Sequence, residues 1–170
     1  MRLQTCVILA ATMLPSVAGA QSPVAEAFRQ NVADVGRNLI VAAERMPADK
    51  YDFKPTPAQM TFGDIVNHLS NGNDFLCGAI TGVSAPMRDA VSVSHGKDAL
   101  VKRLRETFQF CNETLSHLDD SRLSEQLKVF GKTMSRAALE TLTTGDWADH
   151  YSQAAIYLRL NGLLPPTAQK

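Results

Sequence analysis

The residues between positions 23 and 46 carry apolar side chains at a spacing that alternates between four and three positions. This series constrains the fold more than any other feature of the sequence, and it comprises Phe28, Val32, Val35, Leu39, Ala42 and Met46. Residues at this spacing lie on one face of an α-helix, so the segment is predicted to be an amphipathic helix with one buried seam. Pro23 suits the first turn of a helix, and Pro47 ends the pattern.

Three further segments show the same type of periodicity, and we predict helices over residues 61–82, 97–118 and 136–161. Thr61 is a plausible helix cap, Gly82 and Pro86 stop the second helix, and Gly162 follows the last one. Four helices of about 20 residues with such seams describe an all-α four-helix bundle. Residues 119–135 are expected to hold one short helical turn and a turn at Gly131, and no segment is typical of a strand long enough for a sheet.

The first twenty residues have the pattern of a secretory signal peptide. A single charge at Arg2 precedes an apolar stretch, and Pro15 precedes small residues at Ala18 and Ala20. We therefore expect cleavage after Ala20, and a mature, exported domain of residues 21–170 in the periplasm. The apolar stretch is too short for a permanent membrane anchor, so no membrane association is expected of the mature form.

The balance of charge argues against a nucleic-acid partner, because 17 basic residues are matched by 17 acidic ones without a basic stripe. Two cysteines, Cys77 and Cys111, remain after removal of the signal peptide. An oxidising compartment permits a disulfide between them. The interpretation we favour is nevertheless that they are two unbonded buried residues on different helices, because Cys111 is in step with the apolar seam of its own helix.

The last predicted helix has polar residues in the middle of its apolar seam. That seam is expected to comprise Leu139, Leu142, Asp146, His150, Gln153, Tyr157 and Leu160. A carboxylate and an imidazole that face a core are costly unless they are paired or bound to something. Asp146 and His150 are four residues apart, so both side chains can reach one cation.

A third ligand can come from the second helix, where His68 lies next to the seam. Two histidines and one carboxylate suit iron, zinc, nickel or manganese and leave positions open for water or substrate. Asp64, four residues before His68, is a candidate fourth ligand or a residue that orients His68. The alternative is that Asp146 and His150 bond only to each other or to a neighbouring helix.

Three stretches of the chain resemble the DinB-like superfamily. They are YDFKPTP at residues 51–57, FGDIVNHL at residues 62–69 and DHYSQAAIYLRLNGLLPP at residues 149–166. The resemblance implies an up-down-down-up four-helix bundle, a homodimer in many members, and a three-histidine metal site. His68 and His150 match two of those histidines, whereas Asp146 stands where the family has the third.

The resemblance also implies a metal-dependent enzyme of the hydrolase or transferase class that acts on a small-molecule substrate. A divalent ion held by His68, Asp146 and His150 would polarise the substrate or activate water. Gln153 or Tyr151 would assist as hydrogen-bond donors. The alternative is a non-catalytic binding or stress-response module with a degenerate metal site, because Asp146 departs from the family pattern.

Overall fold

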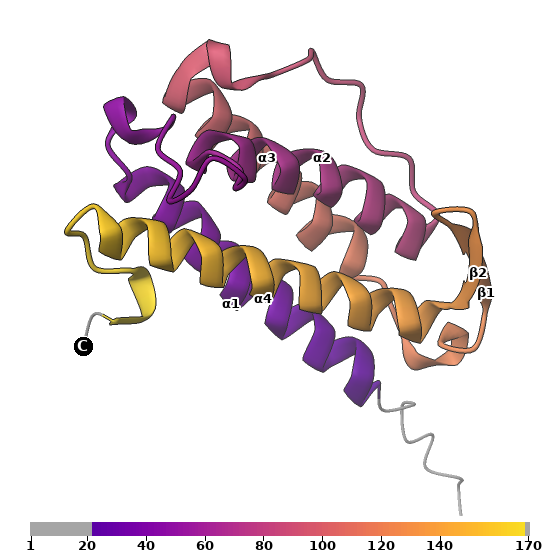
Figure 1. Cartoon of the computed structure of the whole chain (residues 1–170). Coiled ribbons are helices and arrows are strands. Elements are labelled where there is room, and N and C mark those ends of the chain that lie inside the picture. The colour runs from indigo at the N-terminus through magenta and orange to yellow at the C-terminus, as the bar shows by residue number, and fades with distance from the viewer. Residues whose placement is uncertain (1–21, 169–170) are drawn as a thin grey trace, which may run out of the picture.

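The computed structural model describes residues 22–168 and contains a bundle of four long helices (Figure 1). These are α1 (Pro23–Arg45), α2 (Phe62–Thr81), α3 (Gly96–Leu115) and α4 (Arg136–Leu160). The predicted all-α bundle is confirmed, and the helices begin and end within a few residues of the predicted positions. The predicted signal peptide lies outside the described residues. None of the described helices combines the length and the apolar character needed to cross a bilayer.

The connection between α2 and α3 determines the topology of the bundle. Residues 82–95 run back along the length of the bundle, so that α3 starts near the level at which α2 starts (Figure 1). The helices α2 and α3 therefore point in one direction and α1 and α4 in the other, which confirms the up-down-down-up order. Each of α1 and α2 packs mainly against α3 and α4, so α1 and α2 lie diagonally across the bundle.

Local sequence signals explain where α2 begins and ends. Oγ1 of Thr61 accepts a 3.0 Å hydrogen bond from the backbone N–H of Asp64, and Oδ2 of Asp64 accepts a 3.1 Å bond from the N–H of Thr61. This reciprocal pair satisfies two backbone donors that the first helical turn leaves free. At the other end, Gly82 adopts a left-handed conformation with a φ of 78°, which suits a residue without a Cβ atom.

A short β-hairpin precedes α4, and the prediction that the chain contains no sheet was wrong. The strands β1 (Gln126–Val129) and β2 (Lys132–Ser135) pair in antiparallel orientation. Phe130 and Gly131 connect them with φ values of 54° and 70°, as the tight turns of two-residue hairpins require. β1 alternates polar and apolar residues over only four positions, and β2 has a single apolar residue, so both segments were too short to predict a sheet from the sequence. The turn at Gly131 and the short helical turn at Asp120–Arg122 are confirmed.

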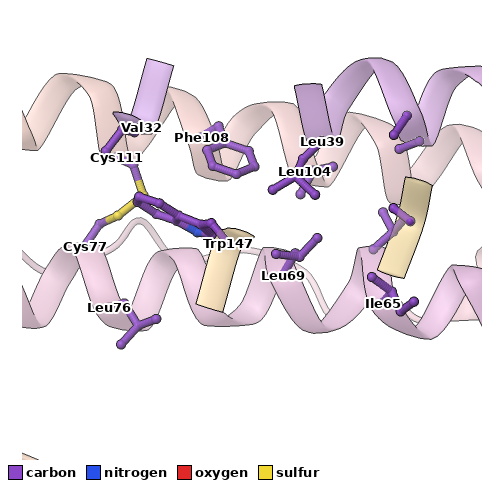
Figure 2. Packing of buried hydrophobic residues seen from close by; sticks show 14 of the residues in the cluster. Val32, Leu39, Ile65, Leu69, Leu76, Cys77, Leu104, Phe108, Cys111 and Trp147 are labelled. Atoms are coloured by element: carbon purple, nitrogen blue, oxygen red, sulfur yellow. A yellow bond between two sulfur atoms is a disulfide. The ribbon is translucent and has the colours of Figure 1, made fainter. Parts of the chain in front are cut away.

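The core lies between all four helices and includes a disulfide. Figure 2 shows Trp147 and the Cys77–Cys111 bond within the cluster of buried apolar side chains. Both cysteines are fully buried, and their Cα atoms are 5.3 Å apart. Our preferred interpretation of two unbonded cysteines was therefore wrong. The parallel helices α2 and α3 bring these two positions to one level, and that relationship depends on topology rather than on local sequence.

Candidate metal centre

The rotation of α4 about its axis decides which of its polar side chains face the core. Leu142 and Leu160 are 41% and 58% exposed, so the seam predicted for this helix was wrong at both residues. The buried stripe runs instead through Leu139, Thr143, Trp147, His150, Ala154, Tyr157 and Leu158. His150 belongs to this stripe, whereas the side chain of Asp146 lies at its edge and is 32% exposed.

Three predicted ligand residues converge between α2 and α4. His68, Asp146 and His150 each offer one ligand atom, and these three atoms all lie within 4.8 Å of one another. Nε2 of His150 lies 3.5 Å from Oδ1 of Asp146, and the ring centroids of His68 and His150 are 4.9 Å apart. We call these three residues the candidate metal cluster. The spacing on α4 brings Asp146 and His150 together, and the packing of α2 against α4 adds His68.

The cluster is open to solvent on one side. The side chain of His150 is 9% exposed and forms its inner part, whereas His68 is exposed at its outer part. The hydrogen bond with the Asp146 carboxylate raises the pKa of His150, and this effect outweighs the opposing effect of burial. Asp149 and Gln153 also favour the protonated ring. A cation that binds here would have to displace the proton that Asp146 favours on His150.

The donor set fits a divalent transition metal. Neutral imidazole nitrogens and a carboxylate oxygen are ligands that zinc, nickel, iron and manganese accept, and three protein ligands leave a position for water or substrate. Nδ1 of His150 is buried and has no hydrogen-bond partner within residues 22–168. A buried ring nitrogen without a partner is uncommon, because it loses hydration without compensation. The donor set and the unpartnered Nδ1 atom both agree with an imidazole of His150 that binds an additional group.

The residues predicted to support the cluster make hydrogen bonds elsewhere. The Asp64 carboxylate caps α2 and also accepts a 2.6 Å bond from the hydroxyl of Thr61. The hydroxyl of Tyr151 lies 2.9 Å from Oγ1 of Thr167. Nε2 of Gln153 donates a 2.7 Å bond to Asp149, although Gln153 lies near enough to His150 to affect its pKa. Of these three residues, Gln153 is thus the one in electrostatic contact with the cluster.

Sequence reasoning missed the contact that sets the position of Asp146. The neighbouring residue, Trp147, is fully buried, and its indole N–H donates a 2.7 Å hydrogen bond to Oδ1 of Asn73 on α2. Asn73 is 1% exposed and also donates from Nδ2 to Oγ1 of Thr107, at 3.2 Å. The available signal was an asparagine four residues after Leu69 and three before Leu76, in the seam of the second helix.

Comparisons with known proteins agree with this fold. Residues 32–154 match the DinB superfamily. A DinB-like protein from Bacillus subtilis has a similar structure, with a TM-score of 0.66 and 17% identity over 80% of this chain and 92% of that chain. A DinB-like protein from Bacillus cereus ATCC 10987 gives a TM-score of 0.69 and 17% identity over 83% of this chain and 95% of that chain. Among proteins with curated descriptions, none matches this sequence.

Proposed function

The chain belongs to the DinB superfamily, and we propose that it is a metal-dependent enzyme of the hydrolase or transferase class with its site between α2 and α4. The observation that carries this proposal is the convergence of His68, Asp146 and His150, whose ligand atoms lie within 4.8 Å of one another. These residues would hold one divalent ion, which would be zinc, nickel, iron or manganese.

A bound divalent ion would supply Lewis-acid chemistry, by polarising a substrate oxygen or by lowering the pKa of a bound water. The side chains of the cluster would position the ligand atoms and leave a path for a small molecule from solvent. Asp146 holds the ring of His150 at the inner part of the cluster. His68 lies at the exposed outer part, so a small molecule can approach the cluster from solvent. Gln153 offers an amide near His150 for orienting such a molecule.

We also propose that the protein acts after export, in the periplasm. The buried Cys77–Cys111 disulfide supports this proposal, since stable disulfides are rare in the cytosol and common in exported proteins. The N-terminal pattern of a charge, an apolar stretch and small residues supports it independently. A homodimer and a small-molecule substrate are further proposals that rest on family resemblance.

A second candidate function is a non-catalytic binding or stress-response module with a degenerate site. The observation that favours it is the pair formed by Asp146 and His150, at 3.5 Å. The hydrogen bond with Asp146 raises the pKa of His150, which supports a pair that forms without an ion. In this alternative, Asp146 stands in place of a metal-binding histidine, and its pair with His150 only stabilises the fold.

Metal content distinguishes the two functions. The untagged mature protein would be analysed by elemental mass spectrometry, beside a His68→Ala/His150→Ala variant. A matched control is His95→Ala/His117→Ala, which removes two histidines outside the cluster. Near-stoichiometric metal in the wild type and in the control, but not in the cluster variant, would support the enzyme proposal. Wild-type protein that takes up no metal after incubation with each of the four ions would instead support the second function.

A further inference from the structure

A second polar group without partners lies between α1 and α4, on the face of α4 that packs against α1 rather than α2. A groove of about 320 Å³ lies between the first half of α1 and the first half of α4. We call it the α1–α4 groove. Phe28 and Glu140 are its most buried lining residues, at 5% and 3% exposure, whereas Val24 is 45% exposed. Phe28 and Glu140 therefore form the inner part of the groove, and Val24 lies at its opening.

Glu140 carries a carboxylate without hydrogen-bond partners. Both of its oxygens are buried, and neither has a partner within the described part of the chain. Burial raises the pKa of Glu140, and the charge of Asp120 adds to this effect, while Arg136 opposes it. Arg136 lies one turn earlier on α4 and donates a 2.6 Å hydrogen bond from Nη2 to Glu125, while its buried Nε and Nη1 atoms have no partner within the described residues. A buried carboxylate that no donor contacts is costly even near a guanidinium, and a cation in direct hydrogen-bond contact with it would offset the cost.

Three other lining residues offer hydrogen-bond acceptors, and Asn31 also carries an amide NH₂ donor. Oδ1 of Asn31 is also buried and has no partner within residues 22–168. The hydroxyls of Thr141 and Thr144 donate to carbonyl oxygens of their own helix, at 2.9 and 3.0 Å, so they offer only lone pairs to the groove. The lining thus combines several acceptors and one acidic group with apolar walls, to which Phe28 contributes an aromatic ring.

We propose that the α1–α4 groove binds a primary ammonium group carried on a short apolar chain. An ammonium group has three N–H donors and one positive charge, which complement the carboxylate of Glu140 and the amide oxygen of Asn31. The apolar chain would lie along Phe28 and the small alanine side chains of the walls. This proposal does not depend on the metal cluster, because that cluster lies on the face of α4 that meets α2.

The test is a calorimetric titration of the full mature protein with n-butylammonium chloride. The neutral isostere 1-butanol serves as the control ligand. We expect butylammonium to bind and butanol to bind about tenfold more weakly or not at all, because charge-assisted hydrogen bonds to Glu140 would be lost. Equal binding of the two ligands, or no binding of either, would overturn the proposal.

Variants locate the binding. Glu140→Gln keeps the shape of the side chain and should weaken butylammonium binding by about tenfold or more. We expect its thermal unfolding midpoint to be no lower than that of the wild type, since the change removes a buried carboxylate without partners. Glu26→Gln removes an equal charge from an exposed position on α1 and should leave binding unchanged. Equal effects of the two substitutions on binding would contradict the assignment of the site.

A second variant tests the groove without touching its charge. Ala27→Leu places a larger side chain on the exposed part of the lining and should reduce binding by narrowing the opening. Unchanged binding in this variant would overturn the location. The ammonium group could belong to a free amine or to a lysine of another protein. Comparison of butylammonium with Nα-acetyl-lysine amide distinguishes these sources, because a lysine site should bind the capped residue at least as tightly.

Discussion

The indole N–H of Trp147 on α4 donates a 2.7 Å hydrogen bond to Oδ1 of Asn73 on α2, and both side chains are almost completely buried. Trp147 directly follows Asp146 in the chain. The bond therefore fixes the rotation of α4 next to the candidate metal cluster. It also explains why Asp146 lies at the edge of the buried stripe, with access to both His150 and solvent.

Removing this bond should destabilise the bundle. Asn73→Ala would leave the indole donor of Trp147 buried without a partner, and we expect a loss of about 1–3 kcal/mol in the free energy of unfolding. Urea denaturation measures this quantity. Asn71→Ala on the same helix is the matched control, since Asn71 is exposed. Equal losses in the two variants would show that the buried bond contributes nothing beyond helix propensity.

The close approach of α1 and α3 should make one glycine sensitive to substitution. A Cβ atom on Gly36 would lie 2.8 Å from Cδ1 of Phe108, whose ring is buried. Overpacking of this kind costs about 1–3 kcal/mol, which exceeds the gain of about 1 kcal/mol in helix propensity. We therefore expect Gly36→Ala to lower the free energy of unfolding.

The control for this prediction is Gly145→Ala on α4, where no atom lies within 4 Å of the added Cβ. It should raise the free energy of unfolding by up to about 1 kcal/mol. Thermal or urea unfolding of both variants measures whether each substitution lowers or raises the free energy of unfolding. A stabilising Gly36→Ala would mean that Phe108 can move aside without cost.

The buried disulfide should contribute substantially to stability. Cys77 and Cys111 are separated by 34 positions in the sequence, and closing a loop of this size stabilises a fold by about 2–4 kcal/mol. We expect the Cys77→Ala/Cys111→Ala variant to unfold at correspondingly lower urea concentration. Reductant should destabilise the wild type and leave the variant unchanged. If reductant lowered the stability of both proteins equally, the disulfide would not be the source of the stability that the wild type loses.

Glu125 should make the protein sensitive to acid. Hydrogen bonds lower the pKa of Glu125 from 4.5 to about 2 in the folded state. The bond from Arg122 has the largest effect, and the bond from Arg136 the next largest. Because the folded-state pKa is the lower one, the stabilisation is complete above about pH 4.5 and is lost as the pH falls toward about 2. Arg136 is 1% exposed, so protonation of Glu125 removes a charged partner from a buried guanidinium.

The measurement is the free energy of unfolding at about pH 5 and about pH 2.5, for the wild type and for Glu125→Gln. The wild type should lose more stability over this interval than the variant does. Other carboxylates titrate in both proteins, so the difference isolates Glu125. Parallel losses would show that the carboxylate does not support Arg136.

Asp146 should influence which metal the cluster prefers. Asp146→His would create a set of three imidazoles, which favours zinc or nickel over manganese more strongly than a set containing a carboxylate. We expect the ratio of zinc affinity to manganese affinity to rise by roughly tenfold or more in competition titrations. Asp149→His is the control, since its carboxylate bonds to Gln153 and lies outside the cluster. An unchanged ratio in Asp146→His would show that Asp146 is not a ligand.

Much of the architecture could be predicted from local patterns. The seam from Phe28 to Met46 and the cap at Thr61 depend on residues a few positions apart. The structure has the cap and buries the seam, except that Val35 is only partly buried and Gly36 is buried beside it. The pairing of Asp146 with His150 follows in the same way from one turn of helix. These features were accessible because helix periodicity and capping involve only neighbours in the chain.

Relationships between distant segments were decided by the tertiary structure alone. They include the Cys77–Cys111 bond and the burial of Glu140 beside α1. The exposure of Leu142 is another case, because the Trp147–Asn73 contact sets the rotation of α4. The sequence by itself determined the helices, their ends and the polar pair on α4, because each depends on contacts within a few turns. Which faces meet, and which polar groups are left without partners, depends on packing between elements that the chain connects only through long loops.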